Sequence, residues 1–393
     1  MKMFASIAAT FSLLAILVAI GCRLLNWVWF RPKRMEKALR KQGLKGNSYR
    51  FLFGDAKETA NMYEESYSKP IGISDDITPR ESFMWVGPRP LVFIMDAELM
   101  KVVMNKHTSF QKPFKTSNPI FKRLIGGVIR YEGEKWSQNR KKLNTLFHLD
   151  RLKGMVATMQ SECEKILDEW SNIVPKDGSP GEVDVFPYLP DYTGSVVSYT
   201  LFSTRFTTAV KRTFNIISEL TLVANQAQPF SIPGEQYLPT KKYRRANAIE
   251  NELTATFTNM MHERLHKRET GEISGQEPDL FDRFLDELNE VDIRDGRAHA
   301  MVVHDVIQQC KLFFVAGYQT TSNLVAWTII MLVVHQDWQA RAREEVFQVL
   351  GNKSKIDADD LGKLKILNMI VHEVLRLYPP SVEVTSTSAE KSI

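Results

Sequence analysis

Cysteine is scarce in this sequence, which has three among its 393 residues, at positions 22, 163 and 310. Their irregular spacing excludes a disulfide framework and is typical of a protein from a reducing compartment. Linkers rich in Gly, Ser or Pro, internal repeats and low-complexity tracts are also missing. A chain of this length with 44% hydrophobic residues can bury a large core. We therefore predict one large domain behind an N-terminal anchor.

Neither sign of charge is in large excess, because 51 Lys and Arg residues face 46 Asp and Glu residues and the net charge is +5. The basic run 241–245 contains one aromatic residue, Tyr243. We interpret this run as the membrane-facing or solvated start of a helix rather than a nucleic-acid site. No nucleic-acid partner is expected.

Charged residues are absent between Met3 and Cys22. At about 1.5 Å per residue, this run spans about 30 Å, the thickness of the bilayer hydrocarbon. Basic residues then crowd positions 23–45, opposed only by Glu36, which predicts that everything downstream lies in the cytosol. We interpret residues 1–26 as an uncleaved single-pass membrane anchor, in preference to a cleaved signal peptide or a lipoprotein signal.

The soluble part is predicted to be mainly α with a small β-sheet. Two apolar stretches within 82–95 flank the turn cluster 87–90, which predicts a β-hairpin. Asp96 can cap the helix that follows. Arg31 and Pro32 are expected to end the membrane helix. Apolar periodicity and helix stop signals predict further helices at 33–42, 135–147, 152–172, 192–202, 210–224, 241–269, 280–290, 304–335, 338–350 and 360–377.

The helix 304–335 is apolar nearly all round, which predicts that it is buried. Its middle reads Ala316-Gly317-Tyr318-Gln319-Thr320-Thr321. A glycine inside a helix costs about 1 kcal/mol relative to alanine. A flat ligand pressed against the backbone at Gly317 would offset that cost. The alternative is an ordinary core helix with satisfied hydroxyls.

Two further pairs stand at helical spacing. Glu373 and Arg376, at i and i+3, can pair on one helix face, as many surface ion pairs do. Trp136 and Arg140, at i and i+4, belong to a cationic face that suits anionic groups. A solvated helix face is the other explanation for the second pair.

Residues 262–266 match the H-E-x-x-H signature of zinc proteases. His262 and His266 would bind the metal and Glu263 would be the general base. Possible third ligands downstream are Asp279, Asp282, Glu287 and Glu290. Arg264 puts cationic charge where a dication would sit, so we interpret the segment as a solvated, charged helix and keep the zinc metalloprotease as the alternative.

Taken together and in this order, the 136–140, 316–321 and 373–376 motifs resemble the cytochrome P450 family of haem-thiolate monooxygenases. The stretches 29–33, 40–46 and 337–346 are similar to a plant microsomal branch that includes secologanin synthase-like enzymes. The resemblance runs from Trp27 to about Thr387 and implies the cytochrome P450 fold, here in residues 27–393.

The resemblance also implies roles for individual residues. Trp136 and Arg140 would bind a propionate of haem b, and Ala316 and Gly317 would face the distal side of the porphyrin. No metal ligand is assigned within the chain.

Further roles concern protons and structure. Thr320 would hydrogen-bond the oxygen that the haem iron binds. Gln319 stands where the family usually has an acid, and an amide can orient water but cannot relay protons as an acid. Glu373 and Arg376 would be a structural pair.

The implied reaction inserts one oxygen atom of O2 into a small lipophilic plant metabolite, terpenoid-like in this branch. Electrons would come from NADPH–cytochrome P450 reductase, at the cytosolic face of the endoplasmic reticulum. The family's haem loop, with its thiolate cysteine, follows the stretch where this sequence stops. We therefore expect an incomplete P450-like domain without the C-terminal haem-loop region, with weak or absent haem binding and negligible activity. A haem-free membrane-anchored remnant is the alternative, and a truncated gene model, splice product or pseudogene would explain either.

Overall fold

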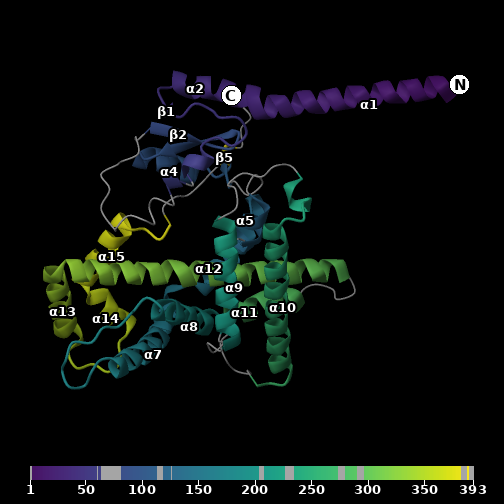
Figure 1. The fold of residues 1–393 in the computed structure, drawn as a ribbon. Coiled ribbons are helices and arrows are strands. Elements are labelled where there is room, and N and C mark those ends of the chain that lie inside the picture. The colour runs from purple at the N-terminus through teal and green to yellow at the C-terminus, as the bar shows by residue number, and fades with distance from the viewer. Residues whose placement is uncertain are drawn as a thin grey trace. The chain divides into compact units, whose positions relative to one another are not determined.

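The computed structural model describes residues 2–59, 61–62, 81–112, 118–124, 126–202, 208–225, 234–272, 279–289, 296–381 and 387–388. Two compact units divide the chain. The first comprises Met1–Asn118, Ala227–Glu235 and Ser386–Ile393, and the second comprises Pro119–Gln226 and Gln236–Thr385. The ribbon in Figure 1 shows the small sheet in the first unit and the crossing helices in the second.

The first unit begins with an unbroken helical path. Helix α1 (Lys2–Leu25) passes through a π-helical turn, η1 (Asn26–Phe30), into α2 (Arg31–Lys41). Helix α1 ends at Leu25, before the predicted end of the membrane helix at Arg31 and Pro32. Pro32 instead lies in the first turn of α2, the predicted short basic helix, where its missing N–H is not needed. The segment Phe11–Lys41 is long and apolar enough, by length and composition, to cross a membrane.

Three strands form the sheet of the first unit, in the order β1 (Lys45–Gly46), β2 (Glu81–Val86) and β3 (Arg89–Ile94). β1 is parallel to β2, whereas β2 and β3 form the predicted antiparallel hairpin. Strand β4 (Phe110–Gln111) pairs separately with β5 (Thr387–Ser388). Helix α4 (Ala97–Asn105) lies between β3 and β4 in the chain, and the backbone nitrogen of Leu99 in its first turn donates to the predicted Asp96 cap over 2.8 Å.

Helix α2 is fastened to this sheet by a small core. Leu39 of α2 packs with Tyr49, Phe83 and Trp85, all buried. Glu36 of α2 is buried as well, because its carboxylate accepts hydrogen bonds from Lys33, Arg40 and the Tyr49 backbone. The exposed face of α2 therefore carries mainly basic side chains.

The second unit is helical throughout its described part. Its elements are α5 (Pro119–Leu124), η3 (Gly127–Ile129), α6 (Gly133–Leu146), α7 (Leu149–Ile173), α8 (Tyr188–Phe202), α9 (Thr208–Asn225), α10 (Lys241–Glu269), α11 (Leu280–Asn289), α12 (Gly296–Val334), α13 (Gln336–Leu350), α14 (Ala358–Lys363) and α15 (Lys365–Leu377), with the 3-10 turn η4 (Glu235–Tyr237) at the junction with the first unit. The predicted helices are present with shifted ends. The segment 360–377 is the exception, because it forms part of α14 and all of α15, separated at Leu364.

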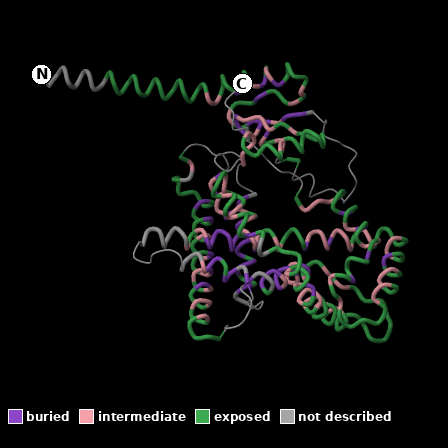
Figure 2. The backbone as a smooth tube through the Cα atoms, turned by 180° about the vertical axis from the view of Figure 1, so that it is seen from behind, coloured by how far each residue is buried: buried purple, intermediate pink, exposed green. Residues whose placement is uncertain are grey.

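Helix α12 is the long helix that passes through the second unit and contacts α8, α9, α10, α11, α13 and α15 (Figure 1). Its buried section centres on Phe314, whose ring lies 4.8 Å from those of Phe202 and Phe214 and 5.3 Å from that of Phe257. Figure 2 shows this buried stretch beside exposed ones along the same helix. The prediction that α12 is buried all round is therefore wrong for one face, because neighbouring helices pack against only part of its surface.

Candidate functional site

The middle of α12 has one packed face and one exposed face. A Cβ built on Gly317 would lie 2.6 Å from Cγ2 of Val197 on α8, so α8 approaches α12 closely at this glycine. Ala316, Gln319 and Thr320 are exposed on the same stretch of helix. The close approach of α8 thus explains the glycine at position 317 without a bound ligand. The predicted role of Gly317 beside a porphyrin stays a prediction.

Side-chain hydroxyls bind the backbone of α12 in this region. Thr320 donates from Oγ1 to the carbonyl oxygen of Ala316 over 2.6 Å. Thr193 of α8, which is buried, lies with its Oγ1 3.0 Å from the carbonyl oxygen of Tyr318. Hydrogen bonds from side-chain hydroxyls to helix carbonyls compete with the backbone hydrogen bonds of the helix and often bend it. Thr193 was not predicted to belong to this site, because it comes from another helix and no local signal in the sequence identifies it.

Helix α6 carries the predicted propionate-binding pair and is joined to α12 through Gln309. The Gln309 amide nitrogen donates to Asn139 of α6 over 3.2 Å, and its oxygen accepts from the Val128 backbone over 3.0 Å. Trp136 is half-buried and Arg140 is exposed. Within the part of the chain that the structure describes, Arg140 makes no hydrogen bond or ion pair. Its guanidinium is therefore available to an anionic group.

The predicted Glu373–Arg376 pair is present on α15. Arg376 donates from Nε and Nη2 to the two carboxylate oxygens of Glu373, at 2.8 and 2.6 Å. The side chain of Glu373 is 55% exposed and that of Arg376 is 66% exposed, so solvent screens the pair and its contribution to stability is small. The bidentate contact lowers the pKa of Glu373 below its ordinary value. The pairing is confirmed, whereas its proposed structural role in the family stays a prediction.

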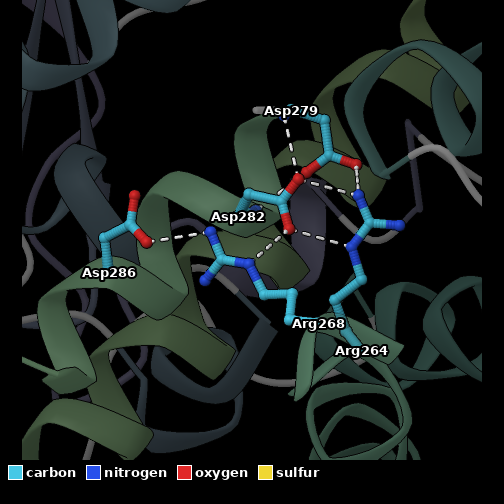
Figure 3. A network of polar contacts seen from close by, with 5 residues as sticks. All are labelled: Arg264, Arg268, Asp279, Asp282 and Asp286. Atoms are coloured by element: carbon cyan, nitrogen blue, oxygen red, sulfur yellow. Dashed lines mark hydrogen bonds and ion pairs between the residues drawn. The ribbon is translucent and has the colours of Figure 1, made fainter. Parts of the chain in front are cut away.

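Arg264, inside the H-E-x-x-H match, lies at the centre of a buried ionic network rather than beside a metal site (Figure 3). It donates to Asp279 over 2.6 Å and to both oxygens of Asp282 over 2.8 and 2.9 Å. Arg268 adds contacts to Asp282 and Asp286. These guanidinium groups, although opposed by burial, hold the pKa of Asp282 below its ordinary value.

Both histidines of the H-E-x-x-H match are exposed on α10, and two of the acids considered as third zinc ligands already bind Arg264. Glu290 and the side chain of Glu287 lie outside the described residues. Over the described ranges, no group of three or more His, Cys, Asp or Glu side chains could hold a metal ion. The geometry therefore gives the zinc protease alternative no support.

The cytochrome P450 family model matches residues 82–390. The chain belongs to the cytochrome P450 family. Two of the proteins to which it is similar are plant proteins. It is 39% identical over 407 residues to cytochrome P450 CYP72A219 of Panax ginseng, covering 100% of this chain and 77% of that one. It is also 39% identical over 385 residues to the 7-deoxyloganic acid hydroxylase of Catharanthus roseus, covering 94% and 73% respectively.

The fold agrees with this membership. The chain matches the solved structure of retinoic acid-bound cyanobacterial CYP120A1 with a TM-score of 0.62 at 19% identity, covering 85% of this chain and 69% of that one. The predictions of a mainly helical P450 fold and of a plant branch of the family, here the CYP72 branch, are confirmed. Haem is the cofactor that this family implies.

The described residues fit haem on one side only. The small Ala316 and the hydroxyl of Thr320 on the exposed face of α12, with Arg140 on α6, suit the distal face and a propionate. The cysteines do not suit the axial position, because a metal ligand must be a thiolate. Cys310 is completely buried in α12, and burial raises the pKa of its thiol well above the ordinary value.

The other two cysteines fit no better. Desolvation and the neighbouring Glu164 raise the pKa of Cys163, which lies on α7. Cys22 is exposed on the apolar helix α1. None of the three cysteines within residues 1–393 therefore has the setting of an axial thiolate.

Proposed function

We propose that this protein, in a form that holds haem, is one of the family's monooxygenases and hydroxylates a small lipophilic plant metabolite, terpenoid-like in structure. The observation that carries the proposal is the two-faced middle of α12 in a P450 chain, with Gly317 against Val197 and Ala316 and Thr320 exposed. The Catharanthus roseus relative is a 7-deoxyloganic acid hydroxylase, which supports the substrate class.

The bound haem would supply the activation of O2, and residues of this chain would prepare its surroundings. Arg140 and Trp136 would hold a propionate through a fixed cationic donor and an indole N–H. Ala316 would leave room for the porphyrin plane. Thr320 would exchange its bond with the Ala316 carbonyl for a bond to oxygen or water, and Gln319 would orient water without acting as an acid.

We propose that residues 1–26 anchor the protein once in the endoplasmic reticulum membrane and that residues 27–393 form one P450-like domain in the cytosol. The uncharged run in α1 and the exposed basic side chains of α2, including Arg34, Lys37 and Lys41, support this orientation. NADPH–cytochrome P450 reductase, acting at the same membrane, would supply the electrons.

For the polypeptide of residues 1–393 by itself we propose weak haem binding and negligible activity. The settings of Cys22, Cys163 and Cys310 support this, because none offers a thiolate to an axial position. A haem-free anchored protein is the alternative. Arg140, which is exposed and has no ion pair among the described residues, favours retention of some haem affinity.

The test is spectroscopic. Purified residues 1–393 are titrated with haemin, then reduced and exposed to CO. We expect weak binding without the absorption band of a thiolate-ligated haem. Arg140→Gln should weaken haemin binding about tenfold, because a charge-assisted hydrogen bond to a propionate is lost.

Arg343→Gln, an exposed arginine on α13, is the matched control and should leave haemin binding unchanged. Equal affinity in the Arg140 variant and the parent would refute the propionate assignment. A thiolate-type band that disappears in Cys163→Ser or Cys310→Ser would refute the statement about the cysteines.

A further inference from the structure

A pocket lies in the second unit, away from the exposed middle of α12. Helices α5, α10 and α12 come together there with the residue that follows η3 (Figure 1). The pocket has a volume of about 290 Å³. Its lining includes Lys122, Arg123, Arg130, Glu250, His304 and Gln308.

Among the residues that the structure describes, the two arginines of this pocket bind only neutral acceptors. Arg123 donates to the side-chain oxygen of Asn247 on α10. Arg130 donates from Nη1 to the backbone carbonyl of Lys122 over 3.2 Å. Across the described residues neither guanidinium contacts a carboxylate. Their positive charges therefore remain available to a ligand at the pocket.

The carboxylate that lines the pocket belongs to Glu250 and is already paired with a buried lysine. Both oxygens of Glu250 accept from Nζ of Lys311 at 3.0 Å, and one accepts from the amide of Gln308 at 3.5 Å. Lys311 is buried and also donates to the carbonyl of Arg123 over 2.6 Å. Glu250 is thus compensated inside the protein and does little to offset the two arginines.

The pKa of Lys311 agrees with this distribution of charge. Burial lowers it first, and the positive charges of Arg130 and Arg123 lower it further, although Glu250 opposes the shift. The two guanidinium groups are therefore close enough for their charge to act on the buried Lys311.

We propose that this pocket binds the oxyanion of a small molecule, a carboxylate or a phosphate, through Arg123 and Arg130. Planar guanidinium groups bind such oxyanions in a bidentate manner, and the volume suits a small ligand. Gln308 precedes Ala316 on α12 by about 12 Å, at about 1.5 Å per residue. The pocket is therefore separate from the proposed haem face, and the inference does not rest on the proposed function.

Isothermal titration calorimetry on purified residues 1–393, without added haem, tests the proposal. The probes are benzoate, its neutral analogue benzyl alcohol, and inorganic phosphate. We expect saturable binding of benzoate or phosphate that weakens as salt is raised, and at least about tenfold weaker binding of benzyl alcohol. Tighter benzoate binding would identify an organic carboxylate as the ligand, and tighter phosphate binding would identify a phosphate.

Single variants locate the site. Arg123→Gln and Arg130→Gln should each weaken binding of the tighter anion about tenfold, because each removes a charge-assisted hydrogen bond. Arg343→Gln removes the same charge outside the pocket and should change nothing. Thermal unfolding of each variant checks that it folds. The proposal is overturned if neither anion binds, if benzyl alcohol binds as well as benzoate, or if folded Arg123 and Arg130 variants bind like the parent.

Discussion

Gly317→Ala tests whether helix packing explains the glycine in the middle of α12. The added Cβ would lie 2.6 Å from Cγ2 of Val197, whereas carbon atoms in favourable contact are about 3.5–4.0 Å apart. The helices cannot separate freely to relieve the contact. Thr193 of α8 bonds the Tyr318 carbonyl over 3.0 Å, and the Phe202 and Phe314 rings lie 4.8 Å apart.

Two opposing terms set the size of the effect. Overpacking of a well-packed interior costs about 1–3 kcal/mol. Replacing glycine by alanine inside a helix returns about 1 kcal/mol. We therefore expect Gly317→Ala to lower the free energy of unfolding by about 0–2 kcal/mol. In a Val197→Ala background the clash is gone, and the same substitution should raise the free energy of unfolding by about 1 kcal/mol.

Urea unfolding followed by far-UV circular dichroism, without haem, measures all four members of this double-mutant cycle. The coupling energy should equal the overpacking term, about 1–3 kcal/mol. Gly154→Ala on α7 is the control, because its Cβ would meet nothing within 4 Å. It should stabilise by up to about 1 kcal/mol. Equal effects of Gly317→Ala in the two backgrounds would show that Val197 is not the reason for the glycine.

Three further predictions concern charge. Arg264→Ala leaves the buried Asp282 carboxylate without its main partner and should lower the free energy of unfolding, measured in urea, by about 3–5 kcal/mol. Arg212→Ala removes an exposed ion pair and should lower it by less than about 1 kcal/mol. Similar losses in the two variants would contradict the importance of the buried network. The pKa of Asp360 is lowered from 3.8 to about 2 by hydrogen bonds from two lysines, so its stabilising contribution is complete above about pH 4 and is lost as pH falls towards 2. Asp360→Asn should flatten the pH dependence of unfolding in that window, and an unchanged pH profile would exclude the effect. In a haem-loaded form, Gln319→Glu should raise product formed per reducing equivalent, and unchanged coupling would remove the idea that the amide limits proton delivery.

Local signals predicted the elements whose ends depend on nearby residues. Helix α10 runs from Lys241 to Glu269, as its periodicity indicates, because Thr240 accepts from the Tyr243 backbone and caps it. Asp96 caps α4 by the same chemistry, and the hairpin of β2 and β3 follows from the turn residues between them. The break at Leu364 was not predicted. Nor was the start of α14 at Ala358, although Asp357 and Asp360 form a capping box there.

The residues of the candidate site fall into two groups, those that local spacing predicts and those that contacts between helices bring in. Glu373 and Arg376 pair as predicted, because a helix brings positions i and i+3 together whatever else surrounds them. The partners of α12 could not be predicted, because contacts between helices depend on how the chain folds back on itself. Thr193 at the Tyr318 carbonyl is one such partner, and Val197 at Gly317 is another.

Motif order and hydrophobic period are properties of the chain, and they were enough to predict the family, the helical class and the residue types available at the site. Which face of α12 is packed and which is exposed follows instead from the way the helices pack together. Helix packing also places Arg264 against Asp279 and Asp282, two of the acids that the sequence offers as metal ligands. It brings Arg123 and Arg130 into one pocket with Glu250, which pairs with Lys311. Those outcomes depend on distances between residues far apart in the sequence, which hydrophobic pattern and spacing do not encode.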